Sequence, residues 1–287
     1  MQTKLTKDIL RAYLPLRPDD GHKGTFGSAL LFCGSPAYIG AATLACAGAL
    51  RTGNGLTALC APKEVCENAL RAFPELVCIP KNNYSFSTSA AALAKATAVL
   101  VGCGCGVSDE LHTFLKQLLL SNGSPVVLDA DALNTLSRDR DDCKQLFANK
   151  RRSLILTPHP LEFSRLTGVD VAAIQENRED VARTFARLWN AVIVLKGAQT
   201  VIASPDGLVQ TVPISTSALS KGGSGDVLAG VITSFLAQGA SPVAAACLGA
   251  YLHAKAGQTL SKEFSPYGVI PSDLPMQIAR ELNSLLS

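Results

Sequence analysis

The chain carries the stretch Lys-Gly-Gly-Ser-Gly-Asp-Val-Leu-Ala-Gly at residues 221–230, where glycines and a serine lead directly into an apolar segment. A helix that begins here leaves its first backbone N–H groups unpaired, and its dipole favours negative charge at that end. Glycine also lets the backbone approach an anion closely, because no Cβ stands in the way. The stretch therefore predicts a phosphate-binding loop at the start of a helix, with Asp226 placed to accept a proton from an attacking hydroxyl. A glycine-rich turn in which Ser224 or Asp226 is an ordinary N-cap explains the same residues equally well.

Outward from this stretch, short apolar runs alternate with helical patterns, which is typical of βαβ units around a mostly parallel sheet. Predicted strands occupy residues 29–32, 56–60, 76–79, 98–101, 125–129, 154–157, 191–196, 201–203 and 208–212. Predicted helices occupy residues 40–52, 63–72, 89–96, 108–121, 139–148, 159–167, 175–190, 224–238, 242–260 and 271–286. The pair Asp206-Gly207 lies between two β-rich runs and predicts an antiparallel edge hairpin.

The pattern contains neither a linker nor a repeat. We therefore expect a single α/β domain over residues 1–287, built as a three-layer α/β/α sandwich. In open sheets of this kind, ligands bind beyond the carboxyl ends of the strands.

Composition excludes several classes of protein. The 26 Lys and Arg residues against 23 Asp and Glu residues give a net charge of only +3, and the longest basic run is residues 150–152, so a nucleic-acid partner is not expected. No apolar run reaches the ~20 residues needed to span a bilayer. The nine cysteines form no Cys-x-x-Cys pair, which leaves zinc and redox motifs unsupported and favours a reducing compartment. We expect a cytoplasmic protein that binds neither nucleic acid nor a membrane.

Two predicted strand exits lie near the middle of the chain. Glycines alternate with cysteines from Gly102 to Gly106 directly after a buried strand, but the spacing fails the dinucleotide pattern Gly-x-Gly-x-x-Gly. This loop either faces a ligand or makes a tight turn packed on a neighbour. Asp129 and Asp131 follow the next strand, where such a pair holds a hydrated magnesium ion or one member caps the following helix.

Two later strand exits carry a histidine and a lysine. His159 stands between two prolines with Glu162 three residues beyond, and a rigidly held histidine suits substrate positioning or proton transfer as well as a structural hydrogen bond in a loop. Lys196 begins the segment Lys-Gly-Ala-Gln-Thr at residues 196–200. A lysine at a strand exit is able to meet a phosphate, although a lone lysine is usually solvated.

Taken in this order, the segments at residues 40–42, 101–106, 129–134, 157–162, 196–200 and 222–230 resemble those of the NAD(P)H-hydrate dehydratase family in the ribokinase-like superfamily. The resemblance covers residues 24–287. It implies a ribokinase-like fold and an activity that uses ADP or ATP to dehydrate the S epimer of hydrated NADH or NADPH.

The resemblance also implies roles for particular residues. The hydrate site is expected to be lined by Ala41, Gly106, His159 and Asp226, with Asp226 catalytic. The adenine nucleotide is expected to be held by Lys196, Gly197, Ala198, Gln199, Thr200, Gly223, Ser224 and Gly225. Magnesium is expected to bridge the nucleotide phosphates, with Asp129, Asp131 and Glu162 as candidate ligands.

This sequence departs from the family at two points. Cysteines occupy positions 103 and 105, where a proline and a bulkier residue are usual. Many members carry an epimerase domain ahead of this one, and the 23 residues before Gly24 are too few to hold it.

The mechanism that we expect makes hydroxide into a better leaving group. Asp226 accepts the proton of the ring hydroxyl while the terminal phosphoryl group transfers to that oxygen, and phosphate then departs. The helix terminus is expected to lower the pKa of Asp226. Backbone N–H groups of residues 223–225 would stabilise the transferring group.

Other functions compete with this one. A small-molecule kinase of the same superfamily, of the thiazole or pyridoxal type, would share the loop and the aspartate. A Rossmann dehydrogenase and a non-catalytic nucleotide-binding regulator are more distant alternatives. ADP is favoured over ATP, and the small-residue helices at 41–49 and 243–250 are compatible with a homo-oligomer, for which a tetramer is favoured.

Overall fold

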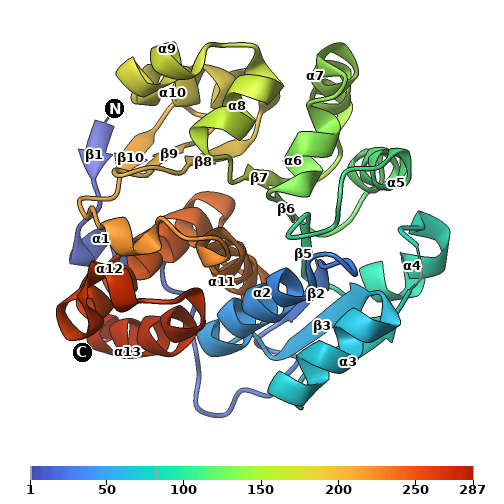
Figure 1. The fold of residues 1–287 in the computed structure, drawn as a ribbon, viewed down its shortest axis with the longest axis horizontal. Coiled ribbons are helices and arrows are strands. Elements are labelled where there is room, and N and C mark those ends of the chain that lie inside the picture. Colours follow the sequence, from blue (N-terminus) through green and yellow to red (C-terminus); the bar gives the residue numbers. More distant parts are fainter. Residues whose placement is uncertain (1, 82, 287) are drawn as a thin grey trace.

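The computed structural model describes residues 2–81 and 83–286, which are arranged around one sheet (Figure 1). The strand order is β1-β10-β9-β8-β7-β6-β5-β2-β3-β4. The strands are β1 Gln2–Lys4, β2 Ser28–Phe32, β3 Leu56–Ala61, β4 Val77–Pro80, β5 Ala98–Val101, β6 Val126–Leu128, β7 Leu154–Leu156, β8 Val192–Leu195, β9 Val201–Ala203 and β10 Val209–Thr211. Only β9 runs antiparallel to its neighbours β8 and β10, which confirms the predicted hairpin at Asp206-Gly207.

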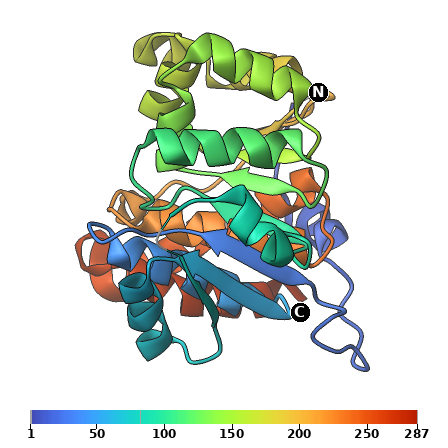
Figure 2. The ribbon, with the colours of Figure 1, turned by 90° about the vertical axis from the view of Figure 1, so that its right-hand side faces the viewer.

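Helices cover both faces of the sheet (Figures 1 and 2). One face packs on α1 Lys7–Tyr13, α2 Ile39–Thr52, α3 Lys63–Ala72, α11 Ser224–Ala237, α12 Pro242–Gly268 and α13 Leu274–Leu286. The other face packs on α4 Phe86–Leu93, α5 Asp109–Leu120, α6 Asp131–Leu136, α7 Arg140–Asn149, α8 Pro160–Thr167, α9 Val171–Glu176 and α10 Arg178–Trp189. Successive residues of a strand divide between these two cores, as Leu31 and Leu30 of β2 do. The predicted α/β/α sandwich is confirmed.

The sequence patterns missed one strand, three α-helices and the 3₁₀ turn η1 Ser217–Leu219, and they misplaced some ends. β1, α1, α6 and α9 were not predicted, and β1 extends the sheet beyond the hairpin by pairing in parallel with β10. Helix α12 continues to Gly268 across a kink at Ser265, whose φ is 63° and which precedes Pro266. The predicted C-terminal helix is divided into the 3₁₀ turn η2 Pro271–Asp273 and α13.

Helices α2 and α11 approach each other closely, because each presents a glycine to the other. A Cβ on Gly48 would lie 2.4 Å from the carbonyl oxygen of Val227, and one on Gly230 would lie 2.0 Å from that of Ala45. No real side chain tolerates such distances. The small residues of α2 therefore serve packing within this chain and fix the position of α11.

Two further observations concern the cysteines and the hydropathy of the helices. All nine cysteines are free thiols, and eight of them are buried. Among the described residues, no helix is both long enough and apolar enough to cross a membrane.

Candidate active site

A cleft of about 660 Å³, here called the main cleft, opens at the carboxyl edge of the sheet. The exits of β6, β7 and β8 supply Asp129, His159 and Lys196, and the first turn of α11 supplies Asp226. Residues 214–221, which include the 3₁₀ turn η1 Ser217–Leu219, and helix α12 complete its walls. The cleft thus has a charged end at the strands and an apolar end near α12.

The glycine stretch forms the start of α11, as predicted. Gly223 is the N-cap with φ 98°, a left-handed conformation that glycine adopts at no steric cost, and the helix runs from Ser224. A Cβ on Gly225 would lie 3.4 Å from the ammonium nitrogen of Lys196. The backbone therefore approaches the charged end of the cleft closely, and the N-terminal N–H groups of α11 provide a site for an anion.

The carboxyl group of Asp226 is held largely away from water in this first turn. Burial, and then the negative charge of Asp129, raise its pKa from the ordinary 3.8 to about 7, against the opposing effects of the Cys103 thiol and Lys196. The expectation that the helix terminus lowers this pKa was therefore wrong, because desolvation and a second carboxylate outweigh the dipole. A carboxyl group with this pKa is a competent general base near neutral pH.

The thiol of Cys103 is the hydrogen-bonding neighbour of Asp226. It is completely buried and lies 3.8 Å from Asp129 Oδ2. A hydrogen bond with Cys33, burial and the two nearby carboxylates all raise the pKa of this thiol well above its ordinary value. Cys103 therefore stays protonated, and its single S–H proton is shared between the neighbouring carboxylates of Asp129 and Asp226.

Lys196 joins two carboxylates at the charged end of the cleft. Its Nζ lies 2.7 Å from Asp129 Oδ1 and 3.9 Å from Glu162 Oε2. Burial alone would lower the pKa of Lys196, but the charges of Asp129 and Glu162 raise it. Thr157 Oγ1 also donates to Asp129 Oδ1 at 2.8 Å. Asp129 is thus fixed by two donors, and Lys196 carries a permanent positive charge into the cleft.

His159 caps helix α8 rather than standing free in a loop. Its Nδ1 accepts from the backbone N–H groups of Leu161 and Glu162, both at 3.2 Å, so the proton of the neutral ring is on Nε2. Burial and the charge of Lys196 lower the pKa of His159, which keeps the ring neutral at pH 7. The ring borders the cleft, and its Nε2 lies 3.4 Å from Glu162 Oε1.

Two positioning residues were missed by the sequence analysis. His253 on α12 borders the cleft, and its Nε2 contacts the carbonyl oxygen of Ser224 at 2.9 Å. Burial lowers the pKa of His253 to about 4, so the neutral ring donates this bond and holds the first turn of α11. Arg178 donates to the carbonyl oxygens of Leu195 at 2.9 Å and Lys196 at 3.0 Å, and so holds the strand exit from behind. Neither residue belongs to a local motif.

Most predicted site residues line the main cleft. Those that do are His159, Lys196, Gly197, Ala198, Thr200, Gly223, Ser224, Gly225 and Asp226, together with the metal candidates Asp129 and Glu162. Ala41, Gly106, Gln199 and Asp131 are not among its lining residues. The roles of both groups of residues remain predictions.

The residues outside the cleft have structural contacts of their own. Asp131 begins α6 and accepts the N–H of Gly106 at 2.8 Å through Oδ2. The carbonyl of Gln199 lies 3.4 Å from an Arg178 nitrogen. Ala41 lies in the first turn of α2, where its Cβ would be 2.7 Å from a Cβ on Gly104. The loop at residues 102–106 is therefore anchored to α6 on one side and to α2 on the other.

The cleft contains carboxylates whose oxygens fit the needs of magnesium. Asp129 and Glu162 line the cleft with oxygen donors of the type that Mg²⁺ prefers. Cys103, Asp129 and Asp226 also place one ligand atom each within 4.8 Å of one another. A protonated thiol is a poor partner for this hard cation, so the two carboxylates Asp129 and Glu162 are the better candidates.

Comparison with known proteins gives consistent results. The family model described as NAD(P)H-hydrate dehydratase matches residues 29–280. The chain is 35% identical over 269 residues to the ADP-dependent (S)-NAD(P)H-hydrate dehydratase of Bacillus subtilis, with 94% of each chain covered. It is 37% identical to the bifunctional NAD(P)H-hydrate repair enzyme Nnr of Moorella thermoacetica, of which it spans about half, 52%. The crystal structure of the ADP/ATP-dependent NAD(P)H-hydrate dehydratase from Bacillus subtilis, co-crystallised with ATP/Mg²⁺, superposes with a TM-score of 0.88 at 33% identity, covering 99% of this chain and 98% of that one.

Proposed function

The chain belongs to the NAD(P)H-hydrate dehydratase family, and on that premise we propose that it uses ADP or ATP to dehydrate the S epimer of hydrated NADH or NADPH. The observation that carries the proposal is the position of Asp226. Its carboxyl group, with a pKa of about 7, lies in the first turn of α11 and borders the same cleft as Lys196. A base, an anion site and a cation thus meet in one cavity.

The reaction follows from these three groups. Asp226 takes the proton of the ring hydroxyl while that oxygen attacks the terminal phosphorus, and the bond from phosphorus to the bridging oxygen breaks. The N–H groups at the start of α11 and the ammonium of Lys196 stabilise charge on the transferring group. The lone pair of the ring nitrogen then expels phosphate as the C–O bond of the ring breaks, which leaves an iminium ion. Loss of a proton from the adjacent ring carbon restores the double bond.

The nucleotide lies along residues 196–200 and 223–225 in this proposal, and His159 contacts the hydrate. Bound Mg²⁺ would neutralise charge on the phosphates, held by them and by Asp129 or Glu162. Ala41 and Gly106 are proposed to complete the hydrate site from the 102–106 loop and the start of α2. ADP is the favoured nucleotide, because the similar Bacillus subtilis enzyme is named as ADP-dependent.

A turnover assay with each hydrate and each nucleotide tests the function. We expect release of inorganic phosphate in step with recovery of the absorbance of reduced nicotinamide. A small-molecule kinase of the same superfamily would instead accumulate a stable phosphorylated product without phosphate release. That result would replace the dehydratase with the kinase.

The chain is also proposed to act as a single domain over residues 1–287, in the cytoplasm, as a homo-oligomer with a tetramer favoured. The small residues of α2 do not support the oligomer, because they pack on α11 within the chain. Light scattering on the purified protein measures the assembly directly, and a monomeric mass would contradict this part of the proposal.

A further inference from the structure

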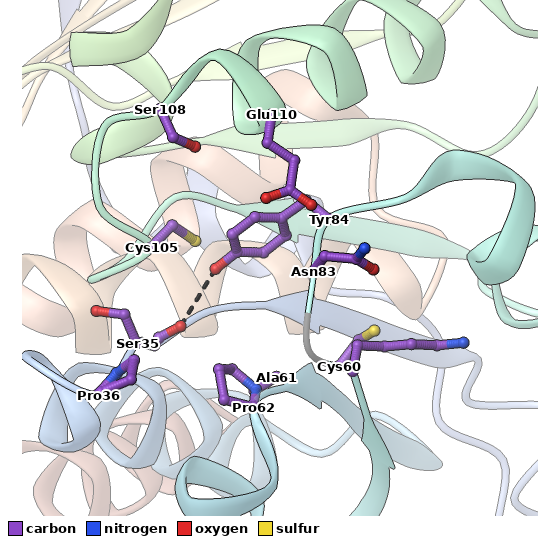
Figure 3. A pocket seen from close by; sticks show the side chains of 12 residues that line it. Ser35, Pro36, Cys60, Ala61, Pro62, Asn83, Tyr84, Cys105, Ser108 and Glu110 are labelled. Carbon is purple, nitrogen blue, oxygen red and sulfur yellow. Dashed lines mark hydrogen bonds between the residues drawn. The ribbon is translucent and has the colours of Figure 1, made fainter.

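A second cavity of about 180 Å³ lies at the carboxyl ends of β2, β3, β4 and β5 (Figure 3). We call it the Tyr84 pocket. Gly34, Ala61, Lys81 and Cys105, which come at the ends of these four strands or just after them, contribute to its lining. It therefore opens on the same edge of the sheet as the main cleft, where α/β proteins bind ligands.

The 102–106 loop follows β5, which lies between β2 and β6 in the sheet, and it is held by contacts toward both neighbours. On the pocket side, the thiol of Cys105 lies 3.2 Å from the carbonyl oxygen of Phe32 and can donate to it. On the other side, the N–H of Gly106 donates to Asp131. A ligand that crosses this loop would have one end in the main cleft and the other in the Tyr84 pocket.

The walls of the Tyr84 pocket suit a flat ring. The ring of Tyr84 is held in place because its hydroxyl donates to the carbonyl oxygen of Gly34 at 3.2 Å. Pro36, Pro62 and Cys60 add apolar surface, as Figure 3 shows. Apolar walls with a few polar groups are typical of small-molecule sites, but the volume admits one ring system and not a whole dinucleotide.

Glu110 supplies the charged group at the rim. It lies in the first turn of α5, is exposed, and directs its carboxylate toward the ring of Tyr84 in Figure 3. Lys81 also lines the pocket, and its ammonium donates one hydrogen bond to the carbonyl oxygen of Thr88 at 2.9 Å. A carboxylate in such a position accepts hydrogen bonds from a ribose diol and repels a phosphate on the same sugar.

We propose that the Tyr84 pocket binds the adenosine end of the hydrated dinucleotide, with Glu110 accepting from the ribose hydroxyls, so that NADH hydrate is preferred to NADPH hydrate. This rests on the proposed function. The hydrated ring must reach Asp226 and the second nucleotide occupies the main cleft, so the adenosine end needs a separate site. In the sheet, β3 is three strands away from β6, and at ~4.8 Å per strand this distance is about 14 Å. An extended dinucleotide is long enough to span it.

The first experiment compares kcat/KM for the two hydrates. We expect the wild type to favour NADH hydrate by about tenfold or more, and Glu110→Gln to lower that ratio toward one without changing the KM for ADP. Asp109→Asn is the matched control, because Asp109 is the preceding residue of the same turn and pairs with Arg138 instead of lining the pocket. A wild-type preference for NADPH hydrate, or an unchanged ratio in Glu110→Gln, would overturn the proposal.

A second experiment uses Tyr84→Leu and the hydrate of the nicotinamide mononucleotide, which lacks adenosine. We expect about a tenfold higher KM for NADH hydrate with unchanged kcat, and no change for the mononucleotide hydrate. Equal losses on both substrates would count against the pocket. Calorimetric titration of wild type and Glu110→Gln with ADP-ribose, in the presence of saturating ADP that fills the main cleft, needs no turnover. Weaker binding to the variant supports the pocket even if the dehydration itself is not observed, and equal binding overturns it.

Discussion

Replacing Asp226 by Asn tests the base and its electrostatic setting together. Folding raises the pKa of this carboxyl from 3.8 to about 7, so its ionisation in the native state costs about 4 kcal/mol, at about 1.4 kcal/mol per pH unit. The native state binds this proton more tightly than the unfolded chain does. The group therefore contributes stability that is fully present below about pH 4 and is lost as the pH rises through about 7.

The raised pKa of Asp226 should be visible both in the stability of the fold and in turnover. Urea denaturation should show Asp226→Asn gaining stability relative to wild type between about pH 4 and pH 8, by at most about 4 kcal/mol. Turnover should fall about 10²–10⁴-fold, because the amide cannot accept the proton, while ADP binding persists. In the wild type, kcat/KM should decrease tenfold per pH unit below about 7.

A control variant and two results test this prediction for Asp226. Asp19→Asn, at an exposed loop position, should change neither turnover nor the pH dependence of stability. Near-normal turnover of Asp226→Asn would remove the carboxylate from the base role. A wild-type profile that stays level down to about pH 5 would show that burial and Asp129 do not raise this pKa as described.

Further predictions concern the groups around Asp226. Arg178→Gln should raise the KM for the nucleotide about tenfold and leave the KM for the hydrate unchanged, because the guanidinium holds the carbonyl groups of residues 195 and 196. Steady-state kinetics measures both KM values, with Arg183→Gln on the same helix as the control. Cys103→Ala should move the acidic limb of the kcat/KM profile to higher pH, since the thiol lowers the pKa of Asp226, and Cys103→Ser should restore it; identical profiles would exclude the hydrogen bond. His159→Ala should weaken hydrate binding more than nucleotide binding in equilibrium titrations, and equal effects would contradict its placement. Chelation with EDTA should abolish turnover and added Mg²⁺ should restore it; full activity after chelation would exclude a role for the ion.

Much of the fold was predictable because buried parallel strands form short, nearly continuous apolar runs. The run at residues 98–101 is an example, and all nine predicted strands exist. β1 was not predictable, because Gln2–Lys4 is polar and joins the sheet through backbone pairing with β10. The six residues of α6 are too few to show a helical period.

The convergence of residues on the main cleft was predictable where a strand exit carries a reactive side chain, as at Asp129, His159 and Lys196. The pKa of Asp226 was not, since it depends on burial and on a carboxylate that only the folded chain brings near. Asp131 shows the same limit, because it is two residues from Asp129 but turns to Gly106. Arg178 and His253 act through backbone carbonyls, which leave no trace in local sequence.

The close glycine contacts between α2 and α11 fix the position of the two helices relative to each other, and α11 carries Asp226 in its first turn. The hydroxyl-rich segment at residues 214–221 contributes another wall of the main cleft. A methyl group added at Gly48 would press on the carbonyl oxygen of Val227, the residue next to Asp226, and would shift the proposed base although Gly48 does not line the main cleft.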